Sequence, residues 1–293
     1  MAITAAAVKE LRERTGAGMM DCKKALTETN GDMEAAIDLM RTSGAAKAAK
    51  KSGRVAAEGL VKVNVSDDGK TATILEVNSE TDFVTKGDAF IGFVNELGDL
   101  ALKTKPANIE EFLTQTMENG DTMEKAREEI VASTGENVTI RRVQTIEAGD
   151  AVLGAYKHGE RIAVLSVLEG GDEELAKDVA MHIAASKPEC VSEDELSEDL
   201  LEREKAIFVE QARESGKPDN IIEKMIVGRM KKFVNEVTLY GQAFVKDPDT
   251  TVGNLVKSKN ASVKAFVRFE VGEGIEKKEE NFADEVMAQA KGE

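Results

Sequence analysis

The chain has 293 residues, which is too long for one ordinary hydrophobic core, and 41% of them are hydrophobic, so we expect a folded protein of two or more domains. Its formal net charge of −16 and the absence of tryptophan argue against a nucleic-acid partner, because the phosphate backbone would be repelled and few rings could stack on bases. No apolar run approaches the ~20 residues that span a bilayer, and no signal peptide is recognisable, which predicts a cytoplasmic protein without a membrane segment.

Residues 1–54 predict a compact module of three short helices followed by a basic linker. The helices are expected at 5–14, at 19–29, and from the N-cap Asp32 to just before Gly44. Gly16 and Gly31 mark the ends of the first two helices. Residues 41–54 contain several basic residues and no acidic one, so they are interpreted as a helical or flexible linker.

The pattern changes to the alternation of β-strands from residue 58 onward. We expect strands at 60–65 and 73–77 joined by an Asp-Gly turn, helices at 89–103 and within 108–134, strands at 138–143, 152–156 and 162–168, and a helix at 173–186. Strands joined by tight turns and followed by helices indicate an α+β fold with antiparallel sheets.

The core contains an internal repeat. Ile74–Val77 resembles Val164–Val167, and Leu102–Pro106 resembles Ala184–Pro188. Between these anchors the first copy has 24 residues, from Val77 to Leu102, whereas the second copy has 16. The first copy therefore carries eight additional residues between its strand and its helix, and we place them around NSETDFVTKGD at 78–88.

An acidic run at 189–204 introduces two long amphipathic helices separated at 215–218, which predicts an inserted antiparallel hairpin at 189–230. Its apolar residues are Leu200, Leu201, Ile207, Phe208, Ile221, Ile222, Met225 and Ile226. They form a seam that could close on itself or on a second copy of the chain. A helix at 251–259, a strand at 263–271 and a last helix at 281–290 are expected to follow.

These features divide the chain into five parts. They are the three-helix module with its linker at 1–54, the first core subdomain at 55–140, the second at 141–188 and 231–271, the hairpin at 189–230, and a C-terminal module at 272–293.

The residues that commonly form catalytic or metal sites do not cluster in the sequence. His158 and His182 have no cysteines or carboxylates at ligand spacing, which argues against a metal site. We expect His182 at the edge of the core, and His158 in an exposed turn, where it either faces solvent or donates a hydrogen bond to another chain. Cys22 has no neighbouring base and is expected to be buried, and no phosphate-binding loop is present, so no cofactor is expected.

Two segments remain as candidate contact sites. Met19 and Met20 follow a glycine turn, where methionine is more often a core residue but can also form an adaptable surface. In Thr81–Val84, composition alone favours a helix cap by Thr81 or Asp82 and a core position for Phe83. The eight additional residues favour instead a surface feature with a function.

Several long motifs, in the same order along the chain, resemble the bacterial translation elongation factor Ts family. They are VKELRERTGAGMMDCKKAL at 8–26, TDFV at 81–84, HIAASKP at 182–188 and RFEVGEGIEK at 268–277. The resemblance implies an N-terminal module like a ubiquitin-associated domain and a guanine-nucleotide exchange factor for elongation factor Tu. Such a factor binds the GDP form and promotes GDP release without covalent chemistry, so that GTP can rebind during elongation.

The resemblance also implies roles for individual residues. Thr81, Asp82, Phe83 and Val84 would dislodge Mg²⁺ from the partner, with Phe83 wedged between helices of its GTPase domain. Arg12, Met19 and Met20 would contact that domain, and His158 would face a β-domain of the partner. Phe83 is therefore expected to be exposed in the free protein and buried only in a complex.

Two further implications concern the hairpin and the neighbourhood of the TDFV segment. The hairpin at 189–230 resembles an insert through which longer members form dimers. Ser79 stands where many relatives have cysteine, and Thr85 where many have alanine; neither change touches the four residues of the segment.

Two alternatives from other classes remain open on the residues alone. The helical triplet could belong to an adaptor that binds some other protein, which would leave the GDP dissociation rate of any GTPase unchanged. An enzyme using His158 or Cys22 would turn over a substrate in the absence of a partner.

Overall fold

The computed structural model describes residues 3–15, 17–214 and 218–276. The chain forms two compact units. One comprises Met1–Lys62, Leu75–Gln144 and Glu270–Glu293, and the other comprises Val63–Ile74 and Thr145–Phe269. The α+β fold class with N-terminal helices and antiparallel strands is confirmed. None of the described helices is long and apolar enough to cross a membrane.

The N-terminal helices are α1 Ala5–Thr15, α2 Met19–Glu28 and α3 Met33–Lys51, and they enclose a small core with Leu11, Cys22 and Leu26 at its centre. Asp32 is the N-cap of α3, as predicted, and its carboxylate accepts a hydrogen bond of 3.0 Å from the Ala35 amide. The predicted helix stop at Gly16 lies outside the described residues.

The predicted end of the third helix before Gly44 is wrong, because α3 continues to Lys51. An added Cβ on Gly44 would lie 3.6 Å from the Cβ of Ala132 in α6, an ordinary packing distance, so Gly44 lies inside a helix that packs on α6 and does not end it. The alanine-rich sequence that follows favours the helix. The segment interpreted as a helical or flexible linker is therefore helical as far as Lys51.

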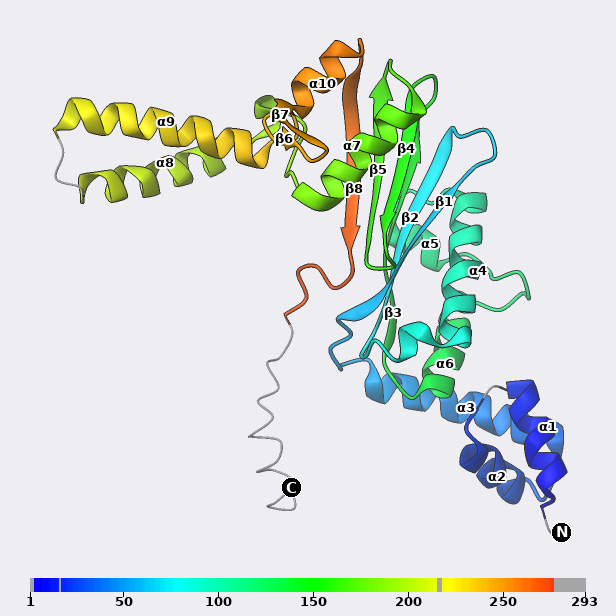
Figure 1. Ribbon diagram of the computed structural model, residues 1–293. Coiled ribbons are helices and arrows are strands. Elements are labelled where there is room, and N and C mark those ends of the chain that lie inside the picture. Colours follow the sequence, from blue (N-terminus) through cyan, green and yellow to red (C-terminus); the bar gives the residue numbers. More distant parts are fainter. Residues whose placement is uncertain (1–2, 16, 215–217, 277–293) are drawn as a thin grey trace. The chain divides into compact units, whose positions relative to one another are not determined.

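The first sheet has the strand order β1-β2-β3 (Figure 1). The elements are β1 Glu58–Val65, β2 Thr71–Ser79, α4 Asp88–Thr104, α5 Ile109–Leu113, α6 Met123–Thr134 and β3 Val138–Glu147. Leu75 and Val77 of β2 join Phe90, Leu97 and residues of the other two helices in one buried core. All nine residues of β2 are buried, so the strand that leads into the TDFV segment is firmly held.

The second sheet has the order β4-β5-β8. Its strands are β4 Val152–His158, β5 Ile162–Glu169 and β8 Ser262–Glu270, and the helices between β5 and β8 include α7 Glu173–Ser186 and α10 Val252–Ser258. Strands β4 and β5 are antiparallel from the pair Val152 and Leu168 to the pair His158 and Ile162. An added Cβ on Gly154 would lie 2.4 Å from the backbone of Ala176, so glycine lets α7 lie against the sheet.

A short hairpin of β6 Ala243–Phe244 and β7 Asp247–Thr251 was not expected from the sequence. Its second strand reads DPDTT, which has no alternation of apolar and polar residues and contains a proline, so no strand pattern was available.

The internal repeat has a clear counterpart in the backbone. Lys105 after α4 and Lys187 after α7 are both left-handed C-caps, with φ of 50° and 47°, and each precedes a proline. The loop before α4 has eight residues, 80–87, and the loop before α7 has three, 170–172, a difference of five; α4 has 17 residues and α7 has 14, a difference of three. Five of the eight additional residues therefore lengthen the loop, and three extend the start of α4.

The inserted hairpin consists of α8 Glu198–Arg213 and α9 Asp219–Val237, which run antiparallel side by side (Figure 1). Helix α9 continues past the predicted limit of the hairpin at 230. Phe208 and Phe233 meet edge to face at 6.4 Å, and the Arg229 guanidinium lies 5.8 Å from the Phe208 ring. The seam thus closes on itself within one chain. The helix predicted at 281–290 lies outside the described residues.

Candidate functional site

The loop at 80–87 presents Phe83 to solvent. Strand β2 ends at Ser79, a 3-10 turn spans Val84–Lys86, and α4 begins at Asp88. The Phe83 residue is 80% exposed, the highest value among the described large hydrophobic residues. The expected exposure of Phe83 is confirmed, and the alternative that it fills the core is wrong. The capping alternative is also wrong, because the N-cap of α4 is Gly87 and no side chain caps it.

Contacts within the loop fix the turn that carries Phe83. The Thr85 hydroxyl donates to the backbone oxygen of Asp82 at 2.7 Å, and the Lys86 ammonium lies 2.6 Å from the Asp82 carboxylate. The same ammonium lies 5.7 Å from the centre of the Phe83 ring. Val84 packs against the core of the first unit. The exposed ion pair adds at most ~1 kcal/mol, so the buried Thr85 and the partly buried Val84 contribute more to holding the turn.

The start of the loop is tied to the link between α6 and β3. The backbone N–H and the hydroxyl of Thr81 both donate to the Glu136 carboxylate, at 2.9 Å and 2.6 Å. In the opposite direction, the Asn137 amide donates to the Glu80 carboxylate at 2.6 Å. We call Glu80, Thr81, Glu136 and Asn137 the loop anchor. Its three hydrogen bonds join residues 55 or 57 positions apart in the chain.

The end of α3 meets the same link. The buried Asn137 side chain donates to the backbone oxygen of Arg54 at 2.8 Å, and the Lys51 ammonium donates to the backbone oxygen of Gly135. The Arg54 guanidinium also lies 3.5 Å from the Glu80 carboxylate. The anchor is therefore attached both to the sheet and to the helix that carries the N-terminal module.

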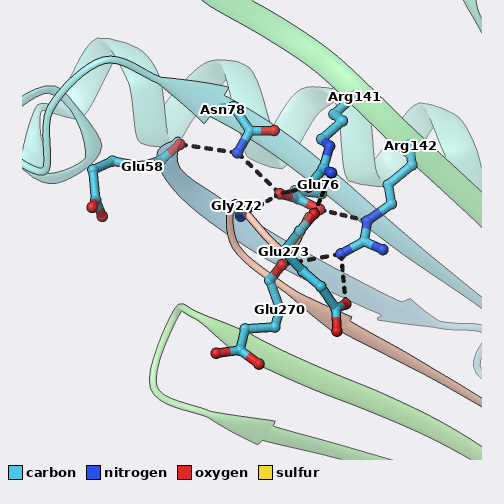
Figure 2. A network of polar contacts seen from close by, with 8 residues as sticks. All are labelled: Glu58, Glu76, Asn78, Arg141, Arg142, Glu270, Gly272 and Glu273. Carbon is cyan, nitrogen blue, oxygen red and sulfur yellow. Dashed lines mark hydrogen bonds and ion pairs between the residues drawn. The ribbon is translucent and has the colours of Figure 1, made fainter. Parts of the chain in front are cut away.

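A buried carboxylate supports the strand that leads into the loop. Figure 2 shows Glu76 of β2 between the guanidinium groups of Arg141 and Arg142 from β3, with the backbone of Gly272 beside them. Glu76 is fully buried, and it accepts hydrogen bonds from Arg141 at 3.0 Å, from the Asn78 side chain at 2.9 Å and from the Gly272 amide at 2.8 Å. This network attaches the turn after β8 to the first sheet.

The candidate contact residues of the N-terminal module lie on its surface. Arg12 is exposed, and Met19 and Met20 are 60% and 74% exposed. The interpretation of the two methionines as core residues is wrong, because Cys22, Ala25 and Leu26 occupy the buried face of α2 instead. These surface residues and Thr81–Val84 belong to the same unit but to different elements.

His158 is the last residue of β4 and is exposed, in the other unit. The Tyr156 hydroxyl lies 3.4 Å from its Nδ1, and the two rings stack at 6.5 Å. The exposed position of His158 agrees with the expectation from the sequence.

His182 is fully buried, deeper than the expected edge of the core. Its Nδ1 accepts a hydrogen bond from the Val245 amide at 3.2 Å, so the proton of the neutral ring lies on Nε2 and is donated to Gln242 at 2.9 Å. Burial lowers the pKa of His182, and the hydrogen bond to Gln242 opposes this in part. These contacts give His182 a structural role.

The other candidate for chemistry, Cys22, is buried as expected, and its thiol faces the backbone oxygen of Ala17 at 3.8 Å. Within residues 3–15, 17–214 and 218–276, no group of three or more His, Cys, Asp or Glu side chains is arranged to hold a metal ion. What this part of the chain does offer is a fixed, exposed aromatic residue beside a carboxylate, an arrangement suited to contact with another macromolecule.

Comparison with known proteins decides the family. The model of the family described as Elongation factor TS matches residues 80–273. The elongation factor Ts of Ruthia magnifica is 79% identical over 292 residues, covering 100% of this chain and 99% of the relative. Those of Vesicomyosocius okutanii and Alkalilimnicola ehrlichii are 70% and 59% identical, covering 99% and 100% of this chain and 100% of each relative.

The chain belongs to the elongation factor Ts family. Elongation factor Ts acts in translation as the nucleotide exchange factor for elongation factor Tu, and it is not an enzyme. The resemblance found in the sequence is thereby confirmed. Membership of this family takes the place of the two alternatives, an adaptor for some other protein and an enzyme. The family match begins at Glu80, the first residue of the loop that presents Phe83.

Sequence reasoning missed the loop anchor. Glu136 and Asn137 follow a helix in a stretch with no motif of its own, and their partners lie more than 50 residues away. The spacing of Asp82 and Lys86, which form an ion pair four residues apart, is a local pattern inside the loop and gives no indication of these distant partners.

Proposed function

We propose that the loop at 80–87 is the part of this exchange factor that acts on the nucleotide site of elongation factor Tu. Thr81, Asp82, Phe83 and Val84 dislodge Mg²⁺ from the GDP complex, and the Phe83 ring enters between helices of the GTPase domain. The observation that supports this proposal is the 80% exposure of a phenylalanine on a turn that is held from both sides.

The energetics follow from linkage. A factor that accelerates GDP release binds the nucleotide-free partner more tightly than the GDP form, and GDP weakens the factor by the same ratio. GDP is held by phosphate-loop amides, a lysine and Mg²⁺, so displacement of those groups removes several charge-assisted contacts together. Burial of the Phe83 side chain contributes about 1.5–3 kcal/mol, which offsets part of the cost of that displacement.

The remaining partner contacts in this proposal come from both units. Arg12, Met19 and Met20 contact the GTPase domain, and His158 faces a β-domain of the partner. Their support is exposure: the two methionines and the imidazole lie at the surface of the free protein, where flexible thioethers and a ring nitrogen can adapt to another chain.

The deciding experiment is Phe83→Ala in a fluorescent-GDP release assay with elongation factor Tu. Loss of the buried ring predicts that GDP release slows roughly tenfold or more. Leu113→Ala is the matched control, because Leu113 is also an exposed hydrophobic residue, at 44%, and lies in α5 of the same unit, outside the loop. Wild-type release by a correctly folded Phe83→Ala protein would contradict the proposal.

We further propose that the hairpin of α8 and α9 joins two copies of the chain. Three large hydrophobic residues in the described part of the hairpin stay exposed although the seam is closed: Ile207, Ile221 and Val227, at 39%, 42% and 70%. A second hairpin would remove these side chains from water, which favours a homodimer.

A further inference from the structure

We propose that Glu136 is a positioning residue for nucleotide exchange, whose carboxylate holds Thr81 and thereby sets the direction in which Phe83 points. The inference rests on the proposed function of the loop at 80–87. It assigns a role to a residue outside that loop, 53 positions after Phe83 in the chain.

The first argument is the geometry of the carboxylate. One oxygen of Glu136 accepts the Thr81 N–H at 2.9 Å, and the other accepts the Thr81 hydroxyl at 2.6 Å. Both hydrogen bonds have a charged acceptor, which makes them stronger than neutral ones. Two bonds from one residue to one carboxylate fix the orientation of Thr81 as well as its position, and Phe83 follows two residues later.

The second argument is that Glu136 itself is held. Gly135 before it is the left-handed C-cap of α6, with φ of 78°, and its amide bonds to the Val131 oxygen. Asn137 after it is buried, and its side chain bonds to the backbone of Arg54. A carboxylate between two fixed neighbours gives the loop a rigid point of attachment.

The third argument is that the contact runs in both directions. The Asn137 amide donates to the Glu80 carboxylate at 2.6 Å, so adjacent residues of the loop and of the link are paired. If the loop became ordered only on binding, the lost conformational entropy would lower the affinity for the partner and the rate of GDP release. The loop anchor removes this cost beforehand, since the backbone leading to Phe83 is ordered in the free protein.

The test compares Glu136→Ala with Glu136→Gln. Alanine removes both acceptors, whereas the glutamine amide can accept from the Thr81 N–H and donate to its hydroxyl, so it preserves the geometry in neutral form. We expect the maximal rate of fluorescent-GDP release to fall roughly tenfold in Glu136→Ala and to be largely restored in Glu136→Gln. The factor concentration at half-maximal rate should change little, because the other partner contacts remain.

A direct readout in the free protein is hydrogen exchange of the Thr81 amide, which should become faster in Glu136→Ala. The matched control is Glu129→Ala, which removes an exposed carboxylate from α6 and should change neither measurement. A Glu136→Ala protein that keeps the wild-type fold and Thr81 exchange rate, or that releases GDP at the wild-type rate, would overturn the inference.

Phe83→Ala, measured in parallel, separates this inference from the proposed function. Slow release in Phe83→Ala with wild-type release in Glu136→Ala rejects the positioning role alone. Wild-type release in Phe83→Ala rejects the proposed function of the loop, and the positioning role with it.

Discussion

Asp82 illustrates how single residues of the loop at 80–87 combine local roles. Its backbone oxygen accepts from Thr85, and its carboxylate is paired with Lys86, which also lies near the Phe83 ring. The carboxylate is half exposed, so the ion pair contributes little to stability. It places a negative charge beside the aromatic ring that, in the proposed function, approaches the phosphate site.

His182 provides a prediction at the residue scale, because its charge state depends on pH. Its pKa is lowered by burial from an ordinary value of 6.5, so below that pH the unfolded chain binds a proton that the folded protein resists. The stability that neutral His182 contributes is present above pH 6.5 and is lost as pH falls towards the folded pKa. We expect the melting temperature to fall less between about pH 7.5 and about pH 5.5 in His182→Gln than in the wild type.

The control for this effect is His158→Gln, because His158 is exposed. Its melting temperature should depend on pH as that of the wild type does. An equal pH dependence in wild-type protein and His182→Gln would show that His182 does not cause the loss of stability.

At the scale of elements, the hairpin of α8 and α9 is closed at its base by backbone hydrogen bonds. The Glu189 amide donates to the Val237 oxygen at 2.8 Å, and the Leu239 amide donates to the Cys190 oxygen at 2.9 Å. The two ends of the hairpin are therefore joined to each other at its base, and the helices can be removed beyond this point.

Replacement of residues 198–235 by a short glycine linker should lower self-association and leave GDP release almost unchanged. The excision keeps the base of the hairpin and removes the exposed Ile207, Ile221 and Val227. Sedimentation and fluorescent-GDP release measure the two effects. Loss of exchange activity with an unchanged oligomeric state would contradict the proposed dimer role.

At the scale of the whole chain, the Glu76 network connects segments that are far apart in sequence. Its carboxylate accepts from Arg141, Arg142 and the Gly272 amide, which lies 196 positions later (Figure 2). Gly272 has φ of 74°, and an added Cβ would lie 2.2 Å from the Ala57 oxygen, so only glycine fits this turn. The end of the described chain is thereby held on the first sheet.

Glu76→Ala should destabilise the protein by about 3 kcal/mol, because it leaves two arginines without their buried partner. Urea unfolding, together with hydrogen exchange of the Gly272 amide, measures the loss. Glu273→Gln is the control, since its carboxylate lies 3.5 Å from Arg142 near the surface and should contribute less than about 1 kcal/mol. Equal stability of the two variants would contradict the central role of Glu76.

Much of the fold was predictable because it depends on local patterns. The helix expected at 173–186 is α7 Glu173–Ser186, and the N-cap Asp32 was recognised from its position before an apolar pattern. The extension of α3 past Gly44 was not predictable, because a glycine after a helical pattern usually indicates the end of the helix. The packing of α3 on α6, which only the structure shows, is what continues it.

The sequence by itself determined the elements, the repeat, the family and the position of the TDFV segment, since periodicity, caps and motifs involve residues close together in the chain. Tertiary structure alone decided that Glu136 holds Thr81 and that Glu76 lies between two arginines, and it decided between the core position and the exposed position that the sequence left open for Phe83. The physical reason is that burial and hydrogen bonding depend on which distant residues meet, and no local pattern encodes a contact across 55 or 196 positions.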